Sequence, residues 1–168
     1  MGVSRRMGSV PACALALGLT TACVIGVAPA EAVDPKSDAV LAANAQFYAA
    51  LNKLFTGDVS SMTEVWSHAD DVTYMGPTGG YDHGWAAVSK DWQGQAALKL
   101  GGRVEPADVR VIVGRTVAVV TDSEVGENTN AQGKIEQVRL RATNSYRMEN
   151  GVWKMVGHHT DPLPYLSK

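Results

Sequence analysis

The sequence predicts an α+β fold in which a cone-shaped, curved antiparallel sheet packs on three N-terminal helices. Apolar residues recur at helical spacing up to residue 102, and the chain after that point alternates as four successive strands. Those strands each span roughly ten or more residues, and strands of that length twist and coil, which gives the sheet a concave face. Helices packed into this concavity form two layers, with a pocket wherever they fail to fill it.

The first 32 residues have the pattern of a signal peptide. Arg5 and Arg6 precede an apolar run, and Ala30-Glu31-Ala32 supplies small residues for cleavage near Ala32. We therefore expect a periplasmic or secreted protein that is not held at a membrane once the leader is removed. The general secretory route fits better than the twin-arginine route, because Gly8 and Ser9 follow the two arginines. An alternative interpretation is a lipoprotein processed at Cys23.

Residues 33–168 have the length of a single domain. Both cysteines of the chain, Cys13 and Cys23, lie in the predicted leader, so the domain has no disulfide, cysteine nucleophile or thiolate metal site. It is mildly acidic and has no basic patch, which argues against nucleic acid as a partner. The sequence contains no dinucleotide fingerprint, phosphate-binding loop or nucleophile elbow, and we predict no cofactor.

Three helices are predicted before residue 102. Ser37 is a suitable N-cap for the first helix, which ends at Gly57. Asp58 caps a second, shorter helix that carries Met62, Val65 and Trp66 on one face. The third helix starts after Gly84 and stops at Gly101-Gly102.

One short strand is predicted between the second and third helices, at Val72 to Met75, and is followed by a glycine-rich turn. The other strands are Arg103 to Val113, Thr116 to Asn128, Lys134 to Met148 and Val152 to Asp161. Asn150-Gly151, between the last two, is a strong hairpin signal.

The order and spacing of several short motifs resemble the nuclear transport factor 2-like superfamily and, within it, the SnoaL-like branch. These motifs are Phe47-Tyr-Ala-Ala-Leu-Asn52, Ala69-Asp-Asp-Val72, Gly76-Pro77, Gly84-Trp85, Arg141-Ala-Thr143, Tyr146-Arg147 and Gly151 through Asp161. The resemblance implies a curved sheet wrapped on helices, homodimers formed through the sheet face, and a pocket used for isomerisation, cyclisation, dehydration or binding. Fold alone does not choose among these activities.

Ketosteroid isomerases of this superfamily use a tyrosine on the first helix, an aspartate base on the first strand and a second acid on a late strand. Alignment on the motifs places Phe47, Gly76 and Asn144 at those positions. Phenylalanine cannot donate a hydrogen bond, glycine cannot take a proton, and asparagine cannot act as an acid of raised pKa. Isomerase chemistry of that type is therefore not expected, and whether the protein is an enzyme stays open.

His158 and His159 are adjacent on the last predicted strand, so their side chains point to opposite faces of the sheet and only one can enter the pocket. Strict alternation groups Trp153 and Met155 with His159 and leaves open which face is inner. The histidine in the pocket is a candidate general base, with Glu124 or Asp161 as its acidic partner. The alternative, which we favour, is a histidine with a structural role at a strand end or dimer contact.

The predicted function is the binding of a small, partly aromatic or apolar molecule inside the cone. Tyr74 and Trp92 are expected to line the cavity, because their aromatic rings lie toward the sheet in this architecture. The full predicted ligand-binding set is Tyr74, Trp92, Glu124, Asn144, His158 and His159, with His158, His159 and Asp161 as candidate catalytic residues and no metal. The alternatives are a cofactor-free cyclase, dehydratase or isomerase that uses a pocket histidine, and a dimerisation or assembly module.

Overall fold

The computed structural model describes residues 1–2, 34–130 and 132–161. The chain divides into two units, Met1–Ala32 and Val33–Lys168, and the helices and strands of the described residues belong to the second. The predicted signal peptide beyond Gly2 and its cleavage site lie outside the described residues.

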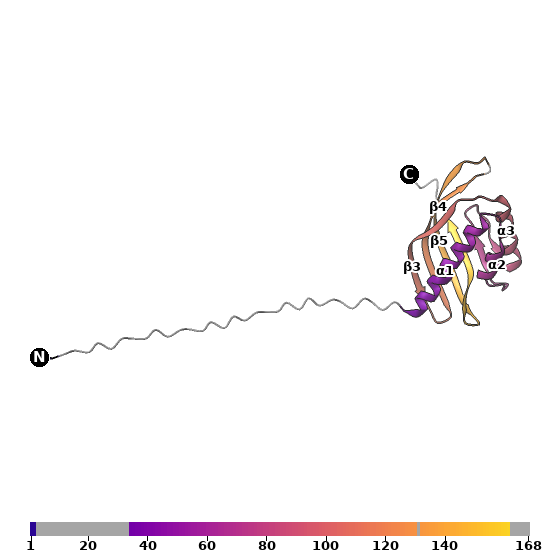
Figure 1. The fold of residues 1–168 in the computed structure, drawn as a ribbon. Coiled ribbons are helices and arrows are strands. Elements are labelled where there is room, and N and C mark those ends of the chain that lie inside the picture. The colour runs from indigo at the N-terminus through magenta and orange to yellow at the C-terminus, as the bar shows by residue number, and fades with distance from the viewer. Residues whose placement is uncertain (3–33, 131, 162–168) are drawn as a thin grey trace. The chain divides into compact units, whose positions relative to one another are not determined.

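In the described part of the chain, three helices pack on one face of a single sheet (Figure 1). They are α1 (Pro35–Leu54), α2 (Ser60–Val65) and α3 (Trp85–Leu98). Within the described part of the chain, none of the helices combines the length and the apolar character needed to cross a membrane.

Two predicted helix caps are wrong. Asp34, rather than Ser37, caps α1, because its carboxylate accepts a hydrogen bond from the Lys36 backbone N–H and Pro35 suits the first helical turn. The second helix begins at Ser60, two residues after Asp58. The Asp58 carboxylate still accepts hydrogen bonds from the Ser60 backbone N–H and hydroxyl, so it supports the turn that leads into α2.

The sheet is curved, open and six-stranded, in the order β2-β1-β6-β5-β4-β3. Its strands are β1 (Thr73–Met75), β2 (Asp82–His83), β3 (Arg103–Val113), β4 (Val117–Thr129), β5 (Ile135–Glu149) and β6 (Val152–Asp161). The four long strands pair antiparallel as predicted. The sequence did not indicate β2, because two residues are too few to show alternation.

β1 pairs with β6 in the parallel direction, which the expectation of a wholly antiparallel sheet missed. Tyr74 is the register partner of His158 in this pairing. Since partners on adjacent strands present their side chains to the same face, the short β1 strand brings a tyrosine ring beside the histidine.

A β-bulge in β6 changes which side chains share a face. Ser145 pairs with Gly157 whereas Tyr146 pairs with Met155, so Val156 is the extra residue. The bulge puts Met155 on the same inner face as His158, and both are buried. The grouping of Trp153 and Met155 with His159 is therefore wrong, because strict alternation cannot anticipate an inserted residue.

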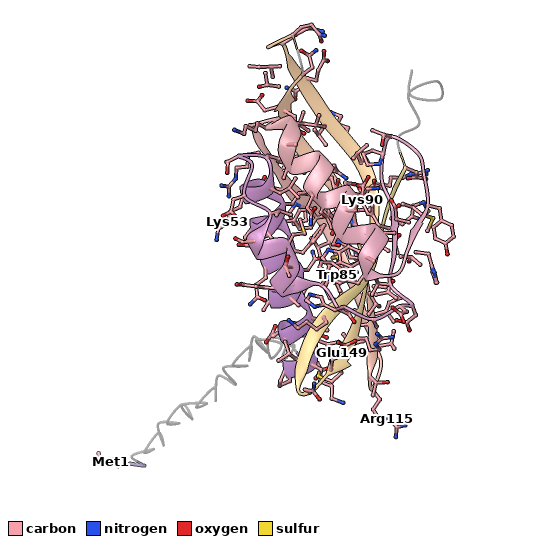
Figure 2. The ribbon with its side chains drawn as sticks, turned by 90° about the vertical axis from the view of Figure 1, so that its right-hand side faces the viewer. Met1, Lys53, Trp85, Lys90, Arg115 and Glu149 are labelled. Carbon is pink, nitrogen blue, oxygen red and sulfur yellow. The ribbon has the colours of Figure 1, made fainter. Side chains whose placement is uncertain are left out.

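The core lies between the helices and the concave face of the sheet. Its largest fully buried side chains include Phe47 from α1, Trp66 after α2, Trp92 from α3 and Met155 from β6. The tip of the β4–β5 hairpin projects from one end of the sheet (Figure 1), and Arg115, in the β3–β4 turn, marks the opposite end (Figure 2).

Candidate functional site

A cavity of about 700 Å³ lies between the helices and the inner face of the sheet. Apolar side chains make up much of its wall: Leu51, Phe55, Leu98, Leu100, Val104, Val138 and Leu140. Leu98 is 64% exposed, whereas Glu124 and His158 are 3% and 4% exposed. The cavity thus runs from an open mouth near Leu98 to a buried end that carries the ionisable groups of Glu124 and His158. We call this buried end the deep end.

His158 is held at the deep end by one hydrogen bond and three aromatic rings. Its Nδ1 lies 2.6 Å from Asn144 Oδ1. The ring centroids of Phe47, Tyr74 and Trp92 lie 4.7, 5.8 and 6.2 Å from that of the imidazole, and the Tyr74 ring is stacked at 8° to it. This enclosure lowers the pKa of His158 to about 3, chiefly because burial penalises the charged form, with a smaller contribution from His159. The imidazole is therefore neutral at physiological pH.

The hydrogen bonds around Asn144 fix which nitrogen of His158 carries the proton. Asn144 Nδ2 donates to Asn44 Oδ1 at 2.9 Å and lies 3.4 Å from Asp122 Oδ2. Because a carboxylate accepts and cannot donate, this contact turns the amide nitrogen of Asn144 toward Asp122 and its oxygen toward His158. Nδ1 must then be the donor, which leaves a lone pair on Nε2.

Glu124 faces that lone pair. Its Oε1 lies 3.6 Å from His158 Nε2, and the contact is not an ion pair because the imidazole is neutral. Burial raises the pKa of Glu124 to about 7; a hydrogen bond from Tyr48 offsets part of this rise, and the charge of Asp122 adds to it. The deep end therefore combines a neutral base with a carboxyl group that holds its proton up to near neutral pH.

Asp122 and Tyr48 form a buried hydrogen-bonded pair behind Glu124. Tyr48 Oη lies 2.7 Å from Asp122 Oδ1 and 3.2 Å from Glu124 Oε1, and Asn44 Nδ2 also donates to Asp122. Burial raises the pKa of Asp122, while the donations from Tyr48 and Asn44 lower it. Donors converge on Asp122 more than on Glu124, so of the two acids Asp122 is better suited to carry the negative charge.

The three positions aligned with isomerase catalytic residues have other environments here. Phe47 packs against His158. Asn144 lies behind His158 and does not line the cavity. A Cβ at Gly76 would collide with Tyr74 Oη, so the phenol fills the space into which a side chain at position 76 would extend. That phenol accepts a hydrogen bond from Gln95 at 2.7 Å, and burial raises its pKa.

His159 and Asp161 lie on the outer face of the sheet, away from this cavity. His159 is exposed, and Asp161 receives two hydrogen bonds from Arg141, of 2.6 and 3.1 Å. The guanidinium holds the pKa of Asp161 below its usual range. Of the predicted site residues, the structure brings Tyr74, Trp92, Glu124 and His158 together at the cavity wall, whereas Asn144 lies behind the wall and Asp161 cannot orient His158.

The sequence interpretation missed the buried polar residues Asn44, Tyr48, Asp122 and Tyr146. Tyr146 Oη donates to Asn44 Oδ1 at 2.8 Å and completes the network from α1 to β5. One signal could have revealed it: Asp122 and Glu124 continue the same face of β4 as Ala118 and Val120. Two acids on an apolar strand face indicate a buried polar site.

The described residues contain no group of three or more histidine, cysteine, aspartate or glutamate side chains placed to hold a metal ion. The deep-end groups belong instead to a hydrogen-bonded chain that runs through amide and phenol side chains.

This architecture, a curved open sheet with helices on one face and a cavity between them, defines the nuclear transport factor 2-like class of α+β proteins. The model of the SnoaL-like domain matches residues 40–163. The chain therefore belongs to the SnoaL-like family. No curated protein matches it.

Solved structures share the fold. A candidate dehydratase of the NTF2-like family from Streptomyces avermitilis is 23% identical with a TM-score of 0.69, over 77% of this chain and 97% of that one. A candidate calcium/calmodulin-dependent protein kinase type II association domain from Thiobacillus denitrificans is 27% identical with a TM-score of 0.63, over 73% and 94%. A candidate aromatic ring hydroxylase from Novosphingobium aromaticivorans is 14% identical with a TM-score of 0.65, over 76% and 89%.

Proposed function

We propose that this SnoaL-like domain binds a small, partly aromatic or apolar molecule in the cavity between α1, α3 and the sheet. The observation that carries the proposal is the cavity itself, because about 700 Å³ lies within the range of small-molecule sites. Its wall is largely apolar, with a few polar groups gathered at the deep end, which is the usual composition of such sites.

The arrangement of the aromatic rings that line the cavity favours a flat ligand. Tyr74 and Trp92 line the cavity with their ring centroids 4.3 Å apart, and Leu140 and Val104 supply aliphatic surface. Aromatic and aliphatic walls bind flat apolar molecules through dispersion and through the release of water.

Filling the cavity tests the proposal. 2-Naphthalenemethanol is expected to raise the thermal unfolding midpoint of the wild-type domain, because a ligand that binds only the folded state stabilises it. Leu140→Trp, which places an indole in the cavity, should remove the shift, whereas Thr143→Trp on the outer face of the same strand should keep it. An equal shift in both variants would place the binding elsewhere and contradict the proposal.

An enzyme is the second candidate, favoured by the pairing of His158 with Glu124. For loss of water from a β-hydroxy ketone, His158 Nε2 would take the α-proton while the protonated Glu124 gives its proton to the departing hydroxyl. A C=C bond forms as the C–O bond breaks and water leaves. Return of the proton from His158 to Glu124 restores both groups. The candidate dehydratase among the structural relatives is consistent with this class of reaction.

The conversion of 4-hydroxy-4-phenylbutan-2-one to its conjugated enone, followed by absorbance, tests this candidate. His158→Ala should abolish turnover while 2-naphthalenemethanol still binds, and His159→Ala should leave turnover unchanged. Absence of turnover in the wild-type domain would reject this candidate for the substrate used.

We also propose export and self-association. The leader pattern supports cleavage near Ala32 and a periplasmic or secreted location, which N-terminal sequencing of the processed protein would test.

The resemblance to a candidate association domain supports assembly through the outer sheet face that carries Arg141 and His159. Light scattering should give the mass of a homodimer, and an unchanged monomer mass at high concentration would reject this proposal.

A further inference from the structure

We propose that the deep end of the cavity recognises a neutral hydroxyl group, which donates to His158 Nε2 and accepts from the Glu124 carboxyl group. This inference rests on the proposed function and names the chemical class of the ligand: a flat alcohol or phenol that carries no negative charge at its buried end. A ketone, an ether or a carboxylate on the same skeleton fits the site less well.

His158 Nε2 is the acceptor for the hydroxyl group of the ligand. Asp122 fixes the Asn144 amide so that its oxygen takes the Nδ1 proton of His158 at 2.6 Å. The lone pair on Nε2 then has to be satisfied by a donor from the cavity side. A hydroxyl group supplies such a donor, whereas a carbonyl or an ether oxygen does not.

The Glu124 carboxyl group is the donor to that hydroxyl group. Tyr48 has a single phenolic proton, and its 2.7 Å contact with Asp122 is shorter than its 3.2 Å contact with Glu124. A phenol that gives its proton to Asp122 leaves Glu124 without a strong donor, which favours the protonated form of this buried acid. The Glu124 carboxyl group can then donate to an oxygen atom of the guest.

The distance between the two groups leaves room for that oxygen. Nε2 and Oε1 are 3.6 Å apart, beyond the usual length of a direct hydrogen bond. An oxygen atom about 2.8 Å from each can bridge them with normal hydrogen-bond lengths. One hydroxyl thus satisfies both groups, donating to one and accepting from the other.

Charge argues against an anionic guest. Among the described residues that line the cavity, the only arginine or lysine is Arg139, which is exposed. A carboxylate at the deep end would add a negative charge close to the buried Asp122 with no cation to compensate it, and it has no proton to donate to His158 Nε2. Burying an uncompensated charge of this kind is strongly unfavourable.

Three probes with one skeleton test the proposal by calorimetry at pH 6: 2-naphthalenemethanol, 2-(methoxymethyl)naphthalene and 2-naphthoate. The alcohol should bind at least about tenfold more tightly than its methyl ether, since a satisfied buried pair is at stake. The carboxylate should bind more weakly than either. Equal affinity for alcohol and ether, or tighter binding of the carboxylate, would overturn the hydroxyl assignment and leave cavity binding intact.

Substitution of the acceptor sharpens the result. His158→Phe keeps an aromatic ring but removes Nε2, so the preference for the alcohol over the ether should disappear while the ether still binds. His159→Phe on the outer face should retain the wild-type preference. If His158→Phe does not fold, the comparison of the three probes on the wild-type domain decides the matter. If no probe binds to the wild-type domain, both this inference and the proposed function are overturned.

Discussion

The inner and outer faces of the sheet shift the pKa of a carboxyl group in opposite directions. On the outer face, Asp161 pairs with Arg141 and its pKa falls. On the inner face, Glu124 is buried beside a neutral histidine and its pKa rises to about 7. Burial without a cation, rather than residue type, makes the inner acid a proton donor near neutral pH.

The two adjacent histidines of β6 also differ according to the face of the sheet on which they lie. His158 is buried, orients its Nδ1 proton toward Asn144 and lines the cavity. His159 is exposed on the far side of the sheet. A single step along the backbone thus separates a candidate binding group from a surface residue, and the predictions that follow test this separation.

The largest expected effect is a loss of stability from the inner face. Met155→Ala should lower the free energy of unfolding by about 2–5 kcal/mol, because it leaves a cavity in the packed core. Val152→Ala, on the same strand but 53% exposed, should change it by no more than about 0.5 kcal/mol. Urea denaturation of both variants measures the difference. Similar losses would contradict the assignment of the two faces.

A second effect depends on pH. The folded-state pKa of Glu124, about 7, lies above the value near 4.5 of an unperturbed glutamate, so its stabilising contribution is present below about pH 4.5 and is lost as the pH rises toward 7. The stability of Glu124→Gln relative to wild type should therefore increase over this window, by at most about 3 kcal/mol.

The outer acid provides the control with the opposite sign. The folded-state pKa of Asp161 is lowered, so its contribution is present at neutral pH and is lost on acidification. Asp161→Asn should thus show its deficit relative to wild type at neutral pH and lose it as the pH falls. Denaturation curves at several pH values compare the two variants, and parallel pH profiles would contradict the account.

The smallest effect concerns a hydroxyl group on the inner face. Among the described residues, Thr160 Oγ1 is buried without a hydrogen-bond partner in the protein. Thr160→Val keeps its shape and removes an unsatisfied group, so stability should rise by up to about 1 kcal/mol. Thr143→Val, exposed on the neighbouring strand, should be nearly neutral. A clear loss of stability in Thr160→Val would show that the hydroxyl group is satisfied in solution.

Most of the fold followed from the sequence because its signals are local. Helical spacing, the glycine stops and Asn150-Gly151 fixed the long elements to within a few residues. The parallel pairing of β1 did not follow, because it joins two strands that are far apart in the chain. The β6 bulge at Val156 did not follow either, because an inserted residue leaves no mark on the alternation pattern. The inner face of β6 could be assigned only after the bulge was known.

The candidate site was predicted in part for the same reason. Tyr74, Trp92, Glu124 and His158 line the cavity, and the predicted architecture together with their residue types suggested them for a pocket. The support provided by Asn44, Tyr48 and Asp122 links α1 to β4, about 75 positions apart in the chain, so no local pattern reveals it. The proton position on His158 follows only from that network.

The most direct test of the account is nitrogen-15 NMR of the His158 ring at pH 6. We expect a protonated Nδ1, a bare Nε2 and no titration of this ring between pH 5 and 8, since its pKa is about 3. His158→Gln identifies the resonances. A proton on Nε2, or an imidazolium at pH 6, would contradict the account, because the cavity would then present a donor where a neutral acceptor is required.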